Sequence, residues 1–555
     1  MNVTKKVRKI ASVALLGLVT VALGCADLDV ENPNAPDQDR ALSTAGDVES
    51  LISGAFHSWW NTAGGRYPST TFILSGMSFQ HSGWPANAGL VFYSGFPRPP
   101  VANNPANEFY SNIADPYEES YSMLSAVRSG LKSINENEDI RSELGATAVA
   151  RDRAFAKFMQ GLGHATVALM YDQGFVLDET TEDGAVQSGE LEPVPYDQLM
   201  SQALTYLDEA ISIAEGNTFT IPAGWMSREV SSTQLAGLAH TLKARYMAAV
   251  ARNPQERDAV DWNAVISELD QGVESFDVQL DPTLYSYEGF ETDVVNYWSF
   301  AAWQQLTYFI HGMADQSGDY QAWLQQPIAD RLPDVNGDPV LIETPDTRYP
   351  QGSTLQEQID NPGEYFAVPD PNSTAPGAAF SLANNFQKPG RGVWRWSYYF
   401  DYRLPLMLGG GAWGFVTEAE TRLLRAEALY RNGQLGQAAQ LVNESRTQHG
   451  LNQTDASGTN TSCVPQLPNG DCGGLLEMLK WEKRLETQYR GLMAAPWYFD
   501  GRGWGDLYGG TPVHFPLPAQ DANLLGITPY TFGGCGQDGA ASNSGYGWPD
   551  QCGGS

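Results

Sequence analysis

The chain has little positive charge, few cysteines and almost no long apolar run. Its 555 residues hold 33 lysines and arginines against 65 aspartates and glutamates, a net charge of −32. So acidic a chain repels nucleic acid and anionic membrane surfaces, and it favours neutral or cationic partners. Beyond the first 24 residues no stretch is apolar enough to predict a membrane-spanning helix. With 42% hydrophobic residues the chain is expected to fold.

Catalytic signatures are also missing. The seven histidines form no HExxH or His-x-His pattern, and there is no G-x-S-x-G motif. Among 65 carboxylates, pairs at glycosidase spacing arise by chance, so they carry little weight. We therefore predict that the protein is not an enzyme and needs no cofactor. A secreted glycan-degrading enzyme is the alternative.

Two motifs resemble ligand-binding loops. Gly409-x-Gly411-x-x-Gly414 has the glycine spacing of a dinucleotide site, but the next two predicted elements are both helices, without the required second strand. We interpret these glycines as a flexible loop. The segment 334–338 (DVNGD) resembles the start of a calcium loop, but Pro345 at the twelfth position cannot supply the bidentate carboxylate. A turn is the favoured interpretation, and a structural calcium ion is the alternative.

The N-terminus has the pattern of an export signal. Four basic residues precede an apolar run over 10–23, which is shorter than the roughly 20 residues that span a bilayer. Gly24 stands directly before Cys25, and the segment 21–25 resembles a bacterial lipobox. We predict a lipoprotein signal peptide over 1–24, a lipid on Cys25 and a tether over 25–43. An ordinary signal peptide followed by an unrelated cysteine is the alternative.

Removal of the signal peptide takes away four basic residues and no acidic one, which changes the net charge from −32 to −36. Ala26 follows the lipid-bearing position, where an aspartate would retain the protein in the inner membrane. We therefore predict an outer-membrane lipoprotein that is exposed at the cell surface.

The remaining cysteines are Cys463, Cys472, Cys535 and Cys552, all in the last fifth of the chain. An even number in an exported protein favours disulfides, and the short spacings favour Cys463–Cys472 and Cys535–Cys552. A zinc site is the alternative, although no CxxC motif supports it.

Apolar residues recur at helical spacing in several segments. The predicted helices cover 44–60, 117–135, 147–171, 197–214, 234–250, 262–276, 418–431 and 434–449. Small residues such as Ala426 and Ala439 lie in the last two, on either side of a tight turn at Asn432-Gly433. Such pairs are typical of tetratricopeptide (TPR) repeats, in which each helix pair buries its apolar face by stacking on a neighbour. Segments 61–116 and 277–415 are rich in glycine, proline and aromatics, and we expect irregular loops there.

Several segments together resemble one family, the SusD/RagB-like outer-membrane lipoproteins. These segments are "RDRAFAKFMQGLGHATVALMYDQG" (151–174), "EAETRLLRAEALYRNGQLGQAAQLVNESR" (418–446), "WEKRLETQYRG" (481–491) and "WYFDGRGWGDL" (497–507). Their order and spacing carry the resemblance, which covers essentially the whole mature chain.

The resemblance implies one mostly α-helical SusD-like domain over 44–555. TPR-like helices over about 117–276 and 418–490 would form a superhelical scaffold. It implies a SusC-like TonB-dependent outer-membrane transporter as partner and an oligosaccharide or peptide as ligand. The lipid-anchored chain would act as a hinged lid that captures nutrient for uptake. A TPR protein-interaction scaffold without a small ligand is a further alternative.

Aromatic residues are the best candidates for ligand contacts, because sugars stack their apolar C–H faces on flat rings. The expected ligand side comprises the loop-rich segments 61–116 and 277–415. The candidate binding residues are Trp84, Asn87, Tyr93, Trp298, Trp303 and Tyr308. Packing of each side chain within the loops is the alternative interpretation.

Replacement of Cys25 by serine removes the thiol to which the lipid is attached, so we expect the variant to be exported but released from the membrane. Metabolic labelling with a radioactive fatty acid, followed by membrane fractionation, measures both effects. The Ala26→Ser variant is the matched control and should stay labelled and membrane-bound. Equal labelling of the Cys25→Ser variant would contradict the lipobox.

Overall fold

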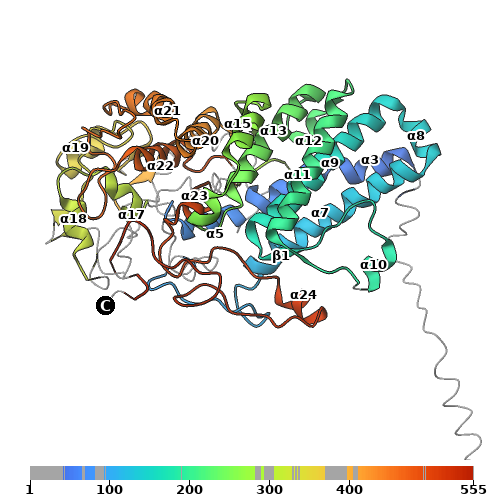
Figure 1. The fold of residues 1–555 in the computed structure, drawn as a ribbon, viewed down its shortest axis with the longest axis horizontal. Coiled ribbons are helices and arrows are strands. Elements are labelled where there is room, and N and C mark those ends of the chain that lie inside the picture. Colours follow the sequence, from blue (N-terminus) through green and yellow to red (C-terminus); the bar gives the residue numbers. More distant parts are fainter. Residues whose placement is uncertain are drawn as a thin grey trace, which may run out of the picture.

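The computed structural model describes most of the chain after the predicted tether. The described residues are 42, 44–65, 69–81, 93, 95–188, 190–281, 289–292, 306–327, 331, 334–335, 338–368, 397–403, 410–491, 493, 496–549 and 551–553. Cys25 and the signal peptide lie outside them. Figure 1 shows the long helices side by side across the upper part of the molecule, with the segment that follows α23 (Pro496–Trp504) running beneath them. No helix in the described part of the chain is both long and apolar enough to cross a membrane.

The first half of the scaffold is a stack of long helices. They are α7 (Ser111–Glu136), α9 (Ala146–Met170), α11 (Tyr196–Glu215), α13 (Ser232–Ala249) and α15 (Trp262–Gln271), and neighbours in this order pack on one another. Glycines in α9 allow the close approach. A Cβ on Gly161 would lie 2.6 Å from Leu207 of α11, and one on Gly163 would lie 2.7 Å from Met123 of α7. The helices therefore pack closely on both sides of α9.

The stack continues into the later helices. Helix α15 contacts α20 (Glu418–Arg431), and α20 packs on α21 (Leu435–Gln448) and α22 (Leu475–Glu486). Ala426 and Ala439 share one buried cluster between these helices, whereas Ala428 faces α13 and α15. Gly433 has φ of 74° at the turn between α20 and α21, a conformation that glycine adopts without strain. The predicted mostly helical fold with paired helices is confirmed.

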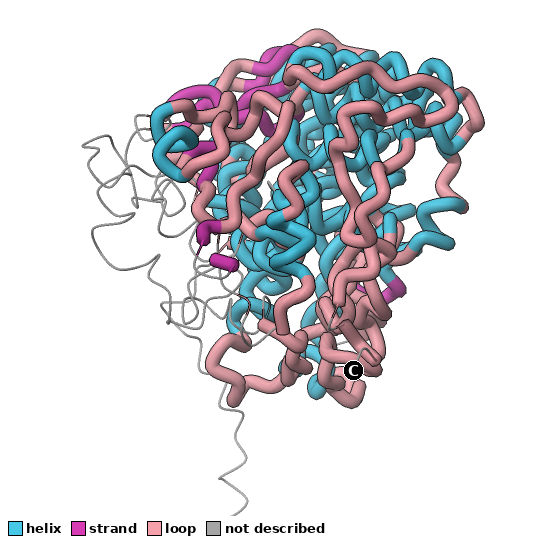
Figure 2. Tube along the Cα trace, turned by 90° about the vertical axis from the view of Figure 1, so that its left-hand side faces the viewer, coloured by secondary structure: helices cyan, strands magenta, loops and turns pink. Residues whose placement is uncertain are grey.

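The remaining helices of the described part of the chain are short. They are α3 (Ala45–Ser53), α4 (Ala55–Trp60), η1 (Asn61–Gly65), α5 (Thr70–Met77), α8 (Glu138–Leu144), α10 (Asp183–Ser188), α12 (Ala223–Met226), α14 (Pro254–Asp258), α17 (Tyr308–His311), η2 (Gly312–Ala314), α18 (Asp319–Leu324), α19 (Leu355–Asp360) and α24 (Ala519–Leu524). Seen from the end where α18 and α19 lie, loop segments face the viewer (Figure 2).

Strands are short and occur in antiparallel pairs. The pairs are β1 (Gln173–Gly174) with β2 (Val194–Pro195), β3 (Thr220–Ile221) with β4 (Val230–Ser231), β5 (Phe276–Leu280) with β10 (Gly411–Val416), β6 (Asp334–Val335) with β7 (Asp338–Pro339), and β8 (Phe366–Ala367) with β9 (Phe400–Asp401). The β6–β7 pairing supports a turn at the calcium-like motif. Among the described residues no group of three metal-binding side chains comes together.

Three predictions about local structure are wrong. Gly411 and Gly414 lie in strand β10, not in a flexible loop, because Trp413 and Phe415 bury one side of that strand; Gly409 lies outside the described residues. The segment 61–116 is not wholly irregular, because it contains α5 and the start of α7. Helix 262–276 ends at Gln271, and Phe276 begins β5. Helix α5 escapes a periodicity search because all eight of its residues are buried, so no polar face marks it.

Buried ion pairs join the later helices to the loops. The Arg348 guanidinium lies 2.8 Å from Asp346, 2.9 Å from Glu482 and 3.0 Å from Glu486. The side chains of Arg348, Asp346 and Glu482 are fully buried. Since an unpaired charge in the interior is very costly, each member depends on the others.

Replacement of Arg348 by methionine should therefore destabilise the protein by about 3–5 kcal/mol, because Asp346 and Glu482 lose their buried counter-charge. Unfolding in urea, followed by circular dichroism, measures the loss. The Arg425→Met variant is the matched control, because Arg425 pairs with Asp270 at the surface, where a pair contributes about 1 kcal/mol or less. Equal losses in the two variants would contradict the importance of the buried network.

Candidate functional site

Two of the six predicted ligand residues lie in the described part of the chain, and both are buried. Tyr308 donates its hydroxyl to the Val340 carbonyl at 2.6 Å, and its ring packs edge-on against Trp323. Tyr93 is 1% exposed and lies near the ring of Phe515. In this structure their rings pack inside the protein, and their contact with a ligand stays a prediction. Trp84, Asn87, Trp298 and Trp303 lie outside the described residues.

Three of the four segments that carry the family resemblance meet in one buried cluster. Arg484 of α22 pairs with Asp506 at 2.7 Å, and the Trp504 indole N–H donates to Glu427 of α20 at 2.8 Å. Arg257 of α14 pairs with both Glu427 and Asp500. The sequence motifs "WEKRLETQ", "WYFDGRGWGDL" and "EAETRLLRAEALYR" are thus adjacent in space, although they are far apart in the chain.

The Glu427 carboxylate of this cluster is held in its charged form. Burial alone would raise the pKa of Glu427, but the charge of Arg257 and its hydrogen bond outweigh burial and lower the pKa to about 2. A general acid needs a proton near neutral pH, which Glu427 lacks. The cluster therefore fastens helices together and is poorly suited to proton transfer.

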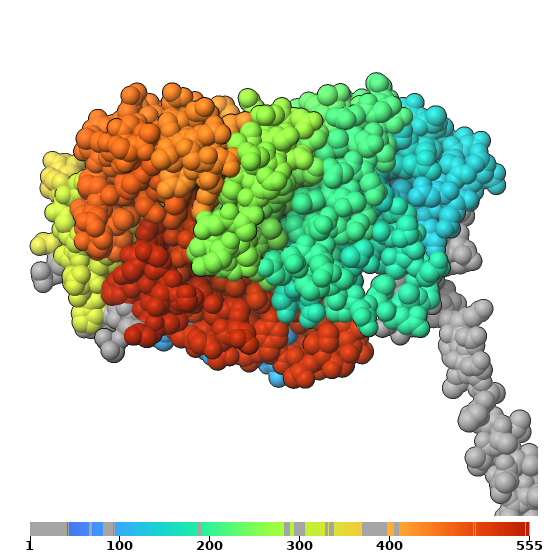
Figure 3. Space-filling view, viewed as in Figure 1, coloured from blue at the N-terminus to red at the C-terminus, as the bar shows by residue number. Residues whose placement is uncertain are grey.

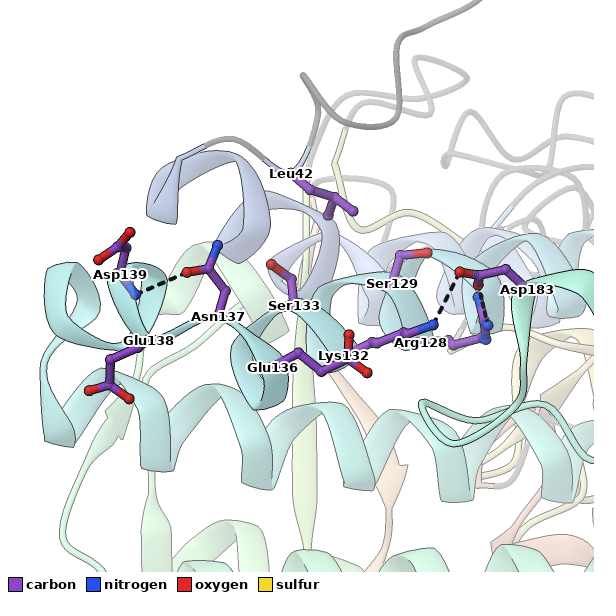
Figure 4. A pocket seen from close by; sticks show the side chains of 10 residues that line it. All are labelled: Leu42, Arg128, Ser129, Lys132, Ser133, Glu136, Asn137, Glu138, Asp139 and Asp183. Carbon is purple, nitrogen blue, oxygen red and sulfur yellow. Dashed lines mark hydrogen bonds and ion pairs between the residues drawn. The ribbon is translucent and has the colours of Figure 1, made fainter.

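One cleft lies where the predicted tether joins the body (Figure 4). It has a volume of about 660 Å³ and is lined by Leu42, Arg128, Ser129, Lys132, Ser133, Glu136, Asn137, Glu138, Asp139 and Asp183. Arg128 and Lys132 both pair with Asp183, so their charges are already matched in part. Glu136 and Glu138 add negative charge, and the cleft offers little to bind an anion.

A second cavity of about 400 Å³ lies between helix ends and the C-terminal segment, which is red in Figure 3 and lies against the green helices. We call it the arginine pocket. Its lining residues are Tyr196, Arg252, Asn253, Pro254, Glu256, Arg502, Gly505, Leu507, Val513, His514, Gly539, Ala540, Ala541, Ser542 and Asn543.

The two arginines also cap helix ends. Arg252 donates to the carbonyls of Ala168 and Tyr171, at the end of α9. Arg502 donates to the carbonyls of Leu169, Val513 and Ala249, the last of which ends α13. A cation at a helix C-terminus is stabilised by the helix dipole, which explains how two buried guanidinium groups are tolerated side by side.

Burial and mutual repulsion still act on these groups. Burial, and then the charge of Arg502, lower the pKa of Arg252 to about 9. Burial, with the charges of Arg252 and Arg502, also lowers the pKa of His514 to about 3, so this imidazole is neutral. The pocket thus contains positive charge that the protein matches incompletely.

Sequence reasoning missed the arginine pocket because five separate segments build it. A usable signal was present in the arginines themselves. Arg252 follows the last residue of α13 by three positions, and Arg502 stands in the last turn of α23, both places where a cation stabilises helix ends.

Two disulfides hold the C-terminal loops. Cys463 pairs with Cys472 and Cys535 pairs with Cys552, with Cα atoms 4.7 Å and 5.4 Å apart, and the predicted pairing is confirmed. The second bridge closes the segment that contains Gly539 and Asn543, one wall of the arginine pocket.

Replacement of both Cys535 and Cys552 by alanine should cost about 3 kcal/mol of stability, the loop-closure value for such a spacing. Hydrogen exchange should rise across 536–549, because the pocket wall loses its closure. The matched control is the Cys463→Ala, Cys472→Ala variant, which should leave exchange in 536–549 unchanged. Unaltered exchange in the first variant would show that other contacts hold the wall.

Comparison with known proteins finds similar solved structures, whereas no family model and no curated protein matches the chain. A SusD superfamily protein from Bacteroides vulgatus is 13% identical; the match covers 87% of this chain and 98% of that one, with a TM-score of 0.49. A SusD superfamily protein from Bacteroides fragilis is 14% identical; the match covers 83% of this chain and 90% of that one, with a TM-score of 0.47. A laminarin-binding SusD-like protein is 14% identical; the match covers 88% of this chain and 98% of that one, with a TM-score of 0.42. These similar structures are thus SusD superfamily and SusD-like proteins, the family that the sequence resembles.

Proposed function

We propose that the mature chain is a lipid-anchored lipoprotein of the outer membrane that binds oligosaccharides or peptides at the cell surface. It delivers them to a SusC-like TonB-dependent transporter and catalyses no reaction. The observation that carries this proposal is the order of features along one chain. A lipobox precedes TPR-like helix pairs and closing motifs, and Arg484, Asp506, Trp504 and Glu427 join those motifs to the helices.

The scarcity of exposed hydrophobic side chains on the described surface supports reversible docking on the transporter. Among the described residues, Leu524 of α24 is the one large hydrophobic side chain that is exposed. A lid that swings away from its transporter must remain soluble when open, and an extended apolar face would prevent this. We infer that the helical side docks through polar contacts, whose strength depends on salt.

Incubation of the purified mature protein with a glycan and peptide panel tests the proposal. Laminarin is the first probe, because it is the ligand named for one similar structure. Calorimetry should detect binding, and chromatography should detect no product. Product release would favour the glycan-degrading enzyme. Failure to bind any glycan or peptide would favour the TPR scaffold.

The predicted aromatic contacts have a separate test. Trp84→Ala should weaken glycan binding up to about tenfold, because a stacked ring contributes about 0.5–1.5 kcal/mol. Trp84→Phe, which keeps a flat apolar ring, should retain most of the affinity. Equal losses in both variants would argue against stacking. Melting curves of the two variants check that the fold is intact.

A further inference from the structure

The arginine pocket differs from the buried sites of Arg257, Arg348 and Arg484. Arg257, Arg348 and Arg484 are also buried, but each lies within 3.0 Å of at least one carboxylate. Arg252 and Arg502 form no ion pair with any carboxylate in the described part of the chain. Two buried cations that share one cavity without an ion-paired carboxylate raise the electrostatic energy of the empty pocket.

Helix capping uses only part of the hydrogen-bonding capacity of these side chains. The backbone carbonyls at the ends of α9 and α13 accept from terminal guanidinium nitrogens. The Nε atoms of both Arg252 and Arg502 are buried and have no hydrogen-bond partner, and Nδ1 of His514 also has none. Arg502 is 2% exposed and Arg252 is 6% exposed. The protein therefore leaves an N–H group of each buried arginine without a hydrogen-bond partner.

Nearby carboxylates are engaged elsewhere. Glu256 accepts the backbone N–H of Arg252 at 2.8 Å and the side-chain amide of Asn253 at 2.5 Å. Asp172 accepts the hydroxyl of Tyr530 at 2.7 Å and the backbone N–H of Leu517 at 2.8 Å. Both carboxylates lower the positive electrostatic potential around the arginines, but neither forms an ion pair with a guanidinium group.

The remaining walls suit a small ligand with mixed polarity. Leu507, Val513 and Ala540 provide apolar surface, and Ser542 and Asn543 provide hydroxyl and amide groups. A volume of about 400 Å³ lies within the usual range for small-molecule sites, about 300–1,000 Å³. The ring of Tyr196 lies 3.5 Å from the guanidinium carbon of Arg252 and holds that group in place.

We propose that the arginine pocket binds a small carboxylate, carried either by a uronic acid sugar or by the C-terminal end of a short peptide. The carboxylate neutralises the charges of Arg252 and Arg502, both of which line the cavity. The sugar ring or peptide backbone lies between the apolar wall and Ser542 and Asn543. This site is separate from the predicted loop-borne ligand site, and it does not depend on the uptake role.

Titration calorimetry of the full mature chain tests the proposal with two pairs of probes. Methyl glucuronide is compared with methyl glucoside, and an N-acetylated dipeptide acid is compared with its amide. We expect at least one acid to bind and its neutral counterpart to bind far more weakly. The acid that binds identifies the source of the carboxylate. Absence of binding by both acids, or equal binding by a neutral counterpart, overturns the proposal.

A negatively charged substitution at the pocket tests whether the acid binds there, and it leaves the helix-capping Arg252 and Arg502 in place. Ser542 is exposed, so glutamate should be accommodated there. Ser542→Glu should weaken binding of the acid about tenfold, because like charges a few ångströms apart repel at the protein surface. Ser542→Gln is the matched neutral control and should bind as the wild type does. Unchanged affinity in Ser542→Glu overturns the assignment to this pocket.

The Trp84→Ala variant separates this proposal from the uptake function. It should lose affinity for glycan at the loops yet keep its affinity for the acid at the arginine pocket. Loss of both activities in a variant with a normal melting curve would show that the acid binds at the loops, and it would overturn the second site.

Discussion

Buried charge on α22 is the interaction on which the arrangement of the later half of the protein depends. Lys480, Glu482, Lys483 and Arg484 are all 5% exposed or less. Glu482 pairs with Arg348 of a loop, Lys483 with Asp500 of α23, and Arg484 with Asp506 beyond it. An ion pair in the interior is tolerated only at good geometry, so each pair sets the register of the segment that it joins. The helix therefore acts as the common anchor for loops that have few regular elements.

The regular elements differ in how clearly the sequence encodes them. Helices α9, α20 and α21 have apolar or small residues at helical spacing, and their positions were predictable to within one residue at each end. Helix α5 was not, because burial on every side erases the periodic signal. Strand β10 was hidden by its glycines, since the burial of Trp413 and Phe415 against other segments decides its conformation.

Sites assembled from distant segments are harder to predict than helices. The disulfide pairs could be predicted because short loop spacings limit the choices. The arginine pocket could not, because Arg252 and Arg502 are 250 positions apart and meet only where α13 and α23 end together. No single segment contains its defining feature, which is two buried cations brought together without a carboxylate paired to either. Individual ligand contacts in the long loops have no local pattern at all.

The Cys535–Cys552 bridge adds a covalent closure to one wall of the arginine pocket. The wall formed by Gly539 and Asn543 lies within the loop that this bridge closes. Thiols stay reduced in the cytoplasm and oxidise only beyond it. If the chain is exported, as we propose, this covalent closure of the wall forms only after the chain reaches an oxidising compartment.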